Sequence, residues 1–163
     1  ARPGDVVAFA GRLGWSAAGL AALRKGFTTP REVDGAHRRP EPPYPQGPAP
    51  ARAGATSLTD VSDGLVADLG HVAVASGVRI DVPRGAFEIA APVAEVAAAL
   101  GADPFDWVLG GGEDHALVAT FVSPAAVPDG WRVIGEVAAQ QGGDNVLVDG
   151  NPYLTGGFDH FRP

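Results

Sequence analysis

The sequence predicts an α+β domain in which helices are layered around a mixed β-sheet. Segments with the apolar spacing of helices and short apolar or alternating runs typical of strands both occur along the chain, and the two kinds do not alternate strictly. In addition, 163 residues provide one domain with a genuine hydrophobic core and are too few for two comfortable ones.

The N-terminal part predicts one strand and one helix. Residues 5 to 10 form a short apolar run, which is typical of a buried strand. Residues 11 to 14 contain two glycines and predict a turn. After the turn, Ser16 is placed to cap a helix that runs to about Lys25 and ends at Gly26.

Residues 27 to 54 have a different character. Their apolar residues show little periodicity, and prolines interrupt the stretch repeatedly, at Pro30, Pro40, Pro42, Pro43, Pro45, Pro48 and Pro50. We therefore expect an extended segment wrapped over the surface. A loop of this length within a compact domain is usually functional or mobile.

The middle of the chain predicts two helices with a strand between them. Residues 60 to 76 have helical spacing and end at Gly77, with one apolar face formed by Val61, Leu65, Leu69, Val72 and Ala73. Residues 78 to 82 alternate like a strand. Residues 92 to 100 predict a second helix, with proline in its first turn and Gly101 after its end.

The C-terminal part predicts three further strands. Residues 107 to 109 lead into a run of three glycines, and residues 114 to 122, 131 to 138 and 145 to 148 have the composition of strands. Residues 156 to 161 form a tail rich in glycine and aromatic residues.

Composition limits the classes of function. The formal net charge is −7, so no basic surface stands ready for nucleic acid or for an anionic membrane. An acidic protein still binds phosphorylated ligands where Mg²⁺ bridges the two.

No apolar run approaches the roughly 18 residues of a membrane span. The absence of cysteine excludes thiolate chemistry and fits a cytoplasmic protein. Since the chain contains no methionine, we interpret it as a fragment or an excised domain.

Two carboxylates and a hydroxyl lie within four residues at the start of the predicted helix over residues 60 to 76. Asp60 and Asp63 are three residues apart, so both point to one side of a helical first turn and are suited to hold Mg²⁺ through oxygen. Ser62 is placed to donate a hydrogen bond to a phosphate. The alternative is structural, because Asp60 as an N-cap and Asp63 as a first-turn acid suit any helix.

A second candidate is the glycine run with the acids that follow it. Gly110, Gly111 and Gly112 allow close approach of a ligand to the backbone, and Glu113 and Asp114 are suited to grip a cationic substrate or a metal. A tight turn with solvated acids explains the same residues.

Other polar and aromatic residues have local explanations. His37, Arg38 and Arg39 are placed either to meet a phosphate or to form an exposed basic patch. His71 follows Asp68 by three residues, so a local ion pair explains it. Phe158 either stacks on an aromatic ligand or pins the tail to the core.

Taken in order, these segments resemble the thiamine-monophosphate kinases, which share a superfamily with aminoimidazole ribonucleotide synthetase (PurM). The family's motifs match in five places: Gly-x-Leu-Gly-x-Ser-x-x-Gly-Leu at residues 11–20, His-x-x-Pro-x-Pro at 37–42, Asp-Val-Ser-Asp-Gly-Leu-x-x-Asp-Leu-Gly-His at 60–71, Gly-Gly-Glu-Asp at 111–114, and Gly-Phe-Asp-His-Phe at 157–161. The match spans nearly the whole chain.

The resemblance implies a fold, a reaction and a set of site residues. The fold would be a PurM-like C-terminal domain with three layers, α/β/α, around a mixed sheet. The reaction would be in-line transfer of the ATP γ-phosphoryl to thiamine monophosphate, without a protein nucleophile. Asp60 and Asp63 would bind Mg²⁺, and Ser62 would contact ATP. Glu113 and Phe158 would contact thiamine monophosphate.

The resemblance also implies what this chain lacks. In this family an N-terminal half carries most of the ATP and magnesium site and forms a homodimer, so residues 1 to 163 would be the C-terminal domain and inactive alone. Three residues depart from the family pattern: Pro43 stands where an arginine is common, and His115 and Ala116 replace Tyr and Glu. A superfamily enzyme with another substrate and a non-catalytic binding domain stay as alternatives.

Overall fold

The computed structural model describes residues 1–153. Its centre is a seven-stranded sheet in the order β2-β4-β1-β5-β3-β6-β7. The strands are β1 (Val6–Ala10), β2 (Ser57–Val61), β3 (Val78–Val82), β4 (Ala116–Phe121), β5 (Arg132–Ala139), β6 (Val146–Val148) and β7 (Asn151–Pro152). Strands β3 and β6 are parallel and the other pairs are antiparallel, so the mixed sheet expected from the sequence is confirmed.

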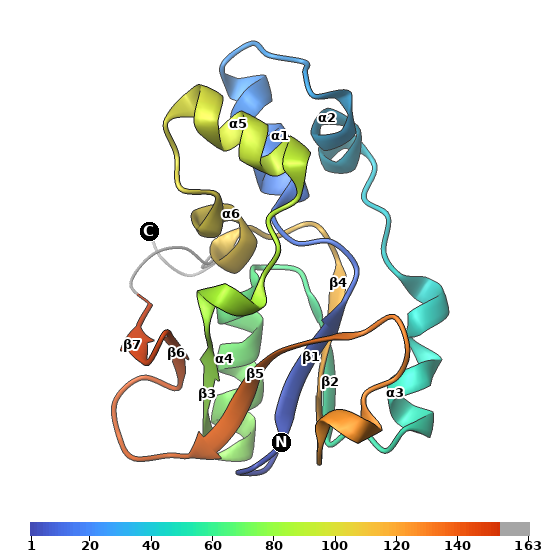
Figure 1. Cartoon of the computed structure of the whole chain (residues 1–163), viewed down its shortest axis with the longest axis vertical. Coiled ribbons are helices and arrows are strands. Elements are labelled where there is room, and N and C mark those ends of the chain that lie inside the picture. Colours follow the sequence, from blue (N-terminus) through green and yellow to red (C-terminus); the bar gives the residue numbers. More distant parts are fainter. Residues whose placement is uncertain (154–163) are drawn as a thin grey trace.

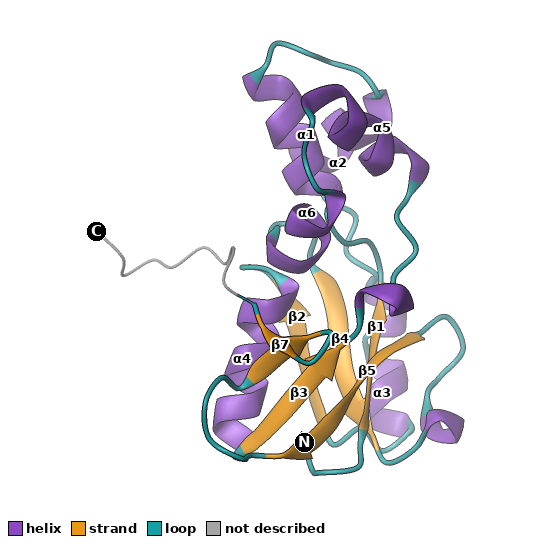
Figure 2. Cartoon of the chain, turned by 60° about the vertical axis from the view of Figure 1, so that its left-hand side comes forward, coloured by secondary structure: helices purple, strands orange, loops and turns teal. Residues whose placement is uncertain are grey.

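Helices cover both faces of the sheet and one of its ends (Figures 1 and 2). Helix α4 (Leu65–Ser76) lies on one face and α3 (Pro48–Arg52) on the other, which gives the three layers. A group of four helices stands at one end of the sheet: α1 (Trp15–Arg24), α2 (Arg31–Arg38), α5 (Ala91–Leu100) and α6 (Pro104–Gly110). Short 3₁₀ turns occupy Tyr44–Gln46, Arg84–Ala86 and Pro124–Ala126.

The main core fills the space between the sheet and α4. Leu65, Leu69 and Ala73 recur at helical spacing on α4 and are fully buried against the sheet. Strand β3 alternates buried and half-buried residues, as its sequence predicts. The strand over residues 78 to 82 is therefore confirmed, and so are Leu65, Leu69 and Ala73 of the predicted α4 face. Val61 of that face lies on β2 instead, and Val72 is half-buried.

The prediction of an extended segment over residues 27 to 54 was wrong. It contains α2, a 3₁₀ turn and α3. Helix α2 offers only two buried apolar residues, Val33 and Ala36, so it shows little periodicity in the sequence. It is stabilised by packing against α1, where a Cβ on Gly19 would lie 2.1 Å from the Val33 carbonyl oxygen.

The helix predicted over residues 60 to 76 begins later than expected. Asp60 and Val61 belong to strand β2, which pairs with β4, and the helix begins at Leu65 after a turn at residues 62–64.

The N-terminal helix also differs in its cap. Gly14 with φ 82° precedes α1, so Ser16 lies inside the helix rather than at its cap. Within residues 1–153, no helix has the length and apolar character needed to cross a membrane.

Candidate functional site

Two connections meet where β2 ends and β4 begins. The 62–64 turn joins β2 to α4, and residues 111–115, here the 111–115 loop, join α6 to β4. The antiparallel register places Val61 opposite Ala116, so the two connections leave the sheet at the same end. The Glu113 N–H donates to the Ser62 carbonyl at 2.9 Å. The sheet therefore brings together two motifs about 50 residues apart in sequence.

Glycine makes this contact possible. A Cβ on Gly112 would lie 2.2 Å from the Ser62 carbonyl oxygen, closer than any carbon atom packs. Gly64 has φ 125°, and a Cβ there would lie 2.6 Å from the Gly110 carbonyl oxygen. The two glycines allow backbone to touch backbone, which fixes the spacing of the side chains on either side.

Asp68 holds the 62–64 turn from inside the molecule. One oxygen of its buried carboxylate accepts backbone N–H groups of Ser62, Asp63 and Gly64 at 3.0, 3.1 and 3.2 Å. Burial raises the pKa of Asp68. The three N–H groups lower this pKa, whereas the nearby Asp63 charge raises it. Asp68 thus satisfies the backbone donors before α4, the role that the structural alternative gave to Asp60 as an N-cap.

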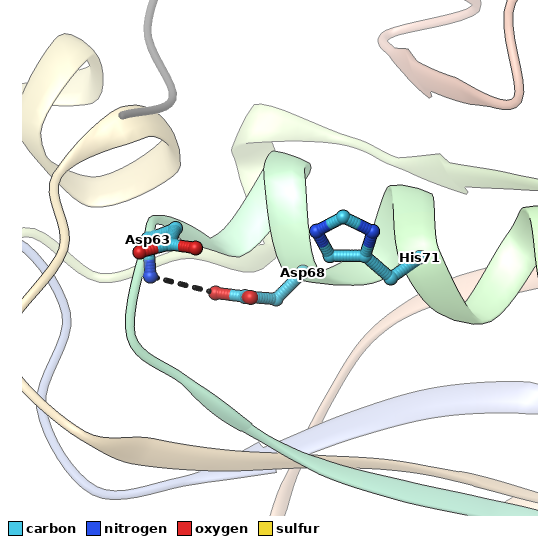
Figure 3. Close-up of side chains that lie close together, drawn as sticks. All are labelled: Asp63, Asp68 and His71. Carbon is cyan, nitrogen blue, oxygen red and sulfur yellow. Dashed lines mark hydrogen bonds between the residues drawn. The ribbon is translucent and has the colours of Figure 1, made fainter. Parts of the chain in front are cut away.

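Asp63, Asp68 and His71 lie together at the start of α4 (Figure 3). One ligand atom from each side chain lies within 4.8 Å of the other two. His71 is exposed and Asp63 is half-buried, so solvent reaches this group. The predicted local ion pair of Asp68 with His71 is not found among the described residues, because Asp68 is directed to the turn.

His115 lies between two of the predicted site residues. Its Nδ1 is 3.8 Å from Asp60 Oδ2, and its Nε2 is 3.7 Å from Glu113 Oε2. Glu113 and His115 have φ of 67° and 51°, a region that non-glycine residues rarely adopt. Such backbone is strained and concentrates at functional sites. The unusual backbone directs Glu113 outward, where its side chain is 72% exposed.

Between these two residues, Asp114 points the other way, into the protein. Its buried carboxylate accepts the backbone N–H groups of Trp15 and Ser16 at 3.0 and 2.8 Å, which caps α1 from outside that helix. Burial raises the pKa of Asp114 to about 6, and the bonds from the backbone of α1 oppose this. Asp114 fixes the 111–115 loop to the helical group.

Two residues of the basic segment, His37 and Arg38, have local partners. The Ser16 hydroxyl lies 3.0 Å from His37 Nδ1, so the helix that Asp114 caps is joined to α2. Arg38 pairs with Asp34 at 2.8 Å on the same helix. These contacts favour the structural explanation for His37.

A hollow of about 320 Å³ adjoins the two connections. Its walls come from the segment before α3 and from the paired strands, and its lining is Pro42, Pro43, Tyr44, Gly47, Asp60, His115 and Leu117. Asp60, His115 and the hydroxyl-bearing Tyr44 are its polar members, so a ligand with an apolar part fits there beside a carboxylate.

The predicted site residues are therefore partly brought together. Ser62, Asp63 and Glu113 lie in the two connections, and Asp60 is joined to them through His115. Among residues 1–153, no group of three potential metal ligands contains both Asp60 and Asp63. Phe158 lies outside the described residues.

The structure adds two residues that the sequence did not single out for this task, Asp68 and Asp114. Both are buried acids that accept backbone N–H groups. For Asp68, the position of an acid in the first turn of a helix was an available signal. For Asp114, no local pattern in the sequence indicates a bond to residues nearly 100 positions away.

Comparisons with known proteins agree on one family. No family model matches the chain. A thiamine-monophosphate kinase of Mycobacterium tuberculosis is 51% identical over 154 residues, which cover 94% of this chain and 45% of that protein. The chain thus spans about half the length of the curated relatives it matches.

Solved structures agree as well. The thiamine monophosphate kinase of Aquifex aeolicus is 32% identical with a TM-score of 0.82, covering 94% of this chain and 52% of that one. The structure of AaThiL complexed with AMPPCP and TMP has a TM-score of 0.88 at 32% identity, covering 99% of this chain and 52% of that one. By sequence and by fold, this chain corresponds to the C-terminal part of the thiamine-monophosphate kinases.

Proposed function

We propose that the protein containing this chain transfers the γ-phosphoryl group of ATP to thiamine monophosphate and forms thiamine diphosphate. One observation carries the proposal: the hydrogen bond from Glu113 to the Ser62 carbonyl holds two matched family motifs together at one end of the sheet. The relatives bear the name of this activity, and one similar structure holds the ATP analogue AMPPCP together with TMP.

The donor set suits magnesium. Asp60 and Asp63 offer carboxylate oxygens, the ligands that Mg²⁺ prefers, and the Asp60 side chain is 56% exposed and open to a hydrated ion. We propose that these two residues hold Mg²⁺. When bound, the ion would screen the repulsion between the two phosphate groups.

The remaining roles belong to the chain's own residues. The Ser62 hydroxyl would donate to a phosphate oxygen of ATP, and Glu113 would accept from or pair with the thiamine part of the substrate. Asp68 and Asp114 would position these residues by fixing the 62–64 turn and the 111–115 loop. Because phosphoryl transfer needs alignment more than covalent chemistry, rigid placement of the two connections is this chain's main contribution.

The partners follow from the same proposal. An N-terminal half of the same protein would supply most of the ATP site and a homodimer contact, and residues 1–163 would form the C-terminal domain. Phe158 would lie against the aromatic part of thiamine monophosphate. We expect the protein in the cytoplasm.

The test is formation of thiamine diphosphate from thiamine monophosphate and MgATP by the full-length protein and its Asp63→Asn variant. We expect the variant to remain folded and to lose at least about 100-fold in turnover, as for other groups that stabilise developing charge. Asp106→Asn is the matched control, since Asp106 is an exposed carboxylate on α6 outside the site. Full activity in Asp63→Asn would remove Asp63 from the site, and a folded wild-type protein without this activity would refute the proposed function.

A further inference from the structure

A second hollow, with a volume of about 480 Å³, lies on the helical group away from the two connections. Its lining residues come from the segment that leads into α1, from the start of α1, from α2 and from the residues after α2. Helices α1 and α2 pack side by side (Figure 1). Its lining is Arg12, Trp15, Arg31, Glu32, Gly35, Ala36, Arg38, Arg39 and Glu41. It shares no lining residue with the hollow that contains Asp60.

Positive charge is concentrated in this hollow. Four arginines line it against two glutamates, in a chain that has 12 basic residues in all and a net charge of −7. Arg12 is paired with Glu41 at 2.7 Å, and Arg38 is paired with Asp34 at 2.8 Å. Arg31 and Arg39 have no ion-pair partner among residues 1–153. Two guanidinium groups are therefore available to an incoming anion.

The backbone keeps the hollow open. Gly35 lies in the middle of α2, where glycine weakens a helix, yet a Cβ there would have no atom within 4 Å. Packing therefore does not require glycine at this position. Arg31, Gly35 and Arg38 are spaced by four and three residues, which places them on one face of α2. The absent side chain leaves room in the hollow on the face of α2 that carries Arg31.

One wall of the hollow is formed by the Trp15 ring and the Arg12 side chain that lies over it. The Arg12 guanidinium lies over the Trp15 ring at 4.7 Å, and its pairing with Glu41 fixes it further. Arg12 is therefore part of the wall rather than one of the guanidinium groups available to an anion. The planar guanidinium groups of Arg31 and Arg39 match the geometry of phosphate oxygens.

We propose that this hollow binds a small phosphorylated molecule directly through Arg31 and Arg39, without a metal ion. The volume lies within the range of about 300–1,000 Å³ usual for small-molecule sites. The strongly acidic remainder of the protein disfavours a long polyanion such as nucleic acid. The site is separate from Asp60 and Asp63, so the proposal does not depend on the proposed kinase activity.

Calorimetric titration with inorganic pyrophosphate, in the presence of EDTA, tests the proposal on the 163-residue chain. Chelation prevents Asp60 and Asp63 from binding phosphate through magnesium. We expect saturable binding at one site. Arg31→Gln with Arg39→Gln lowers the affinity at least about tenfold, because two charge-assisted contacts are lost.

Two further variants distinguish specific binding in the hollow from non-specific attraction of the anion to positive charge. Arg2→Gln with Arg52→Gln removes the same amount of charge from exposed positions outside the hollow, and its affinity stays within about twofold of the wild type. Gly35→Leu keeps every charge but fills part of the hollow, and it weakens binding at least about fivefold because less room is left for the anion. Circular dichroism confirms that each variant is folded.

The proposal is wrong if the folded wild-type chain gives no binding of pyrophosphate, or if both double variants lose affinity equally. Binding of a polyglutamate peptide in place of pyrophosphate would also overturn it, since the hollow would then serve an acidic protein segment.

Discussion

At the scale of single residues, two buried carboxylates shape the candidate site without reaching its surface. Asp68 accepts three backbone N–H groups of the 62–64 turn, and Asp114 accepts two from the start of α1. Each bond joins a charge to a donor that has no other helical partner, and such bonds are stronger than neutral ones. The exposed carboxylates of Asp60 and Glu113 do not accept these backbone N–H groups, so they are accessible to ligands.

Replacing Asp68 should damage both stability and placement. Asp68→Ala leaves three N–H groups without their acceptor, so we expect the free energy of unfolding to fall by about 2–3 kcal/mol. Asp68→Asn keeps one acceptor oxygen and should lose less. Urea unfolding of both variants measures this, and a change within about 0.5 kcal/mol for Asp68→Ala would show that the bonds contribute little.

The raised pKa of Asp114 predicts a dependence of stability on pH. Because the folded carboxyl has a pKa of about 6 and its ordinary value is 3.8, the folded state binds the proton more tightly than the unfolded state. The contribution of Asp114 to stability is therefore fully present below pH 3.8 and declines as the pH rises toward 6.

Denaturant unfolding at several pH values between 3.8 and 6 measures whether the free energy of unfolding falls as the pH rises. The wild type should lose the Asp114 contribution between these values, and the decline should be smaller in Asp114→Asn. Asp106→Asn, which changes an exposed carboxylate, should retain the wild-type decline. An Asp114→Asn variant with an unchanged pH profile would assign the decline to other groups.

At the scale of elements, pairing with a neighbour decided several assignments. The local sequence places Asp60 at the start of a helix, but the backbone of residues 57 to 61 pairs with β4 in a regular antiparallel register. Similarly, Val33 is buried in a small core whose other members come from α1 and α5: Ala18, Ala22, Val93 and Val96. Propensity is a weak signal when an element is short, since its stability comes from its neighbour.

The contact between the 62–64 turn and the 111–115 loop predicts a sharp contrast between two glycines. Gly112→Ala forces the two connections apart, so we expect a loss of roughly 1–3 kcal/mol in the free energy of unfolding. Gly70→Ala lies on α4 with no atom within 4 Å of the new Cβ, and it should gain about 0.5–1 kcal/mol. Thermal unfolding of both variants compares them, and equal effects would contradict the close contact.

At the scale of the whole molecule, the chain is about half of the proteins it resembles. Its candidate site lies where β2 ends and β4 begins, with Asp60 and Glu113 exposed. Both carboxylates lie near His115 and are open to solvent, and exposed carboxylate oxygens are suited to a metal ion. Under the proposed function, the half of the relatives that this chain does not cover would complete the site.

The 163-residue chain should not form thiamine diphosphate by itself, because it would lack most of the ATP site. The assay with thiamine monophosphate and MgATP should show activity only for the full-length protein. Measurable turnover by the folded chain would contradict the division of the site between two halves.

The sequence by itself determined the fold class, the helical face of Leu65, Leu69 and Ala73, and the family. These depend on spacing and on local motifs, which are properties of neighbouring residues. Only the tertiary structure decided that Asp60 lies on a strand and that Asp68 and Asp114 support the site. It also placed Glu113 beside Ser62. Such contacts join residues far apart in the chain, and their energy comes from strand pairing and burial that no local segment contains.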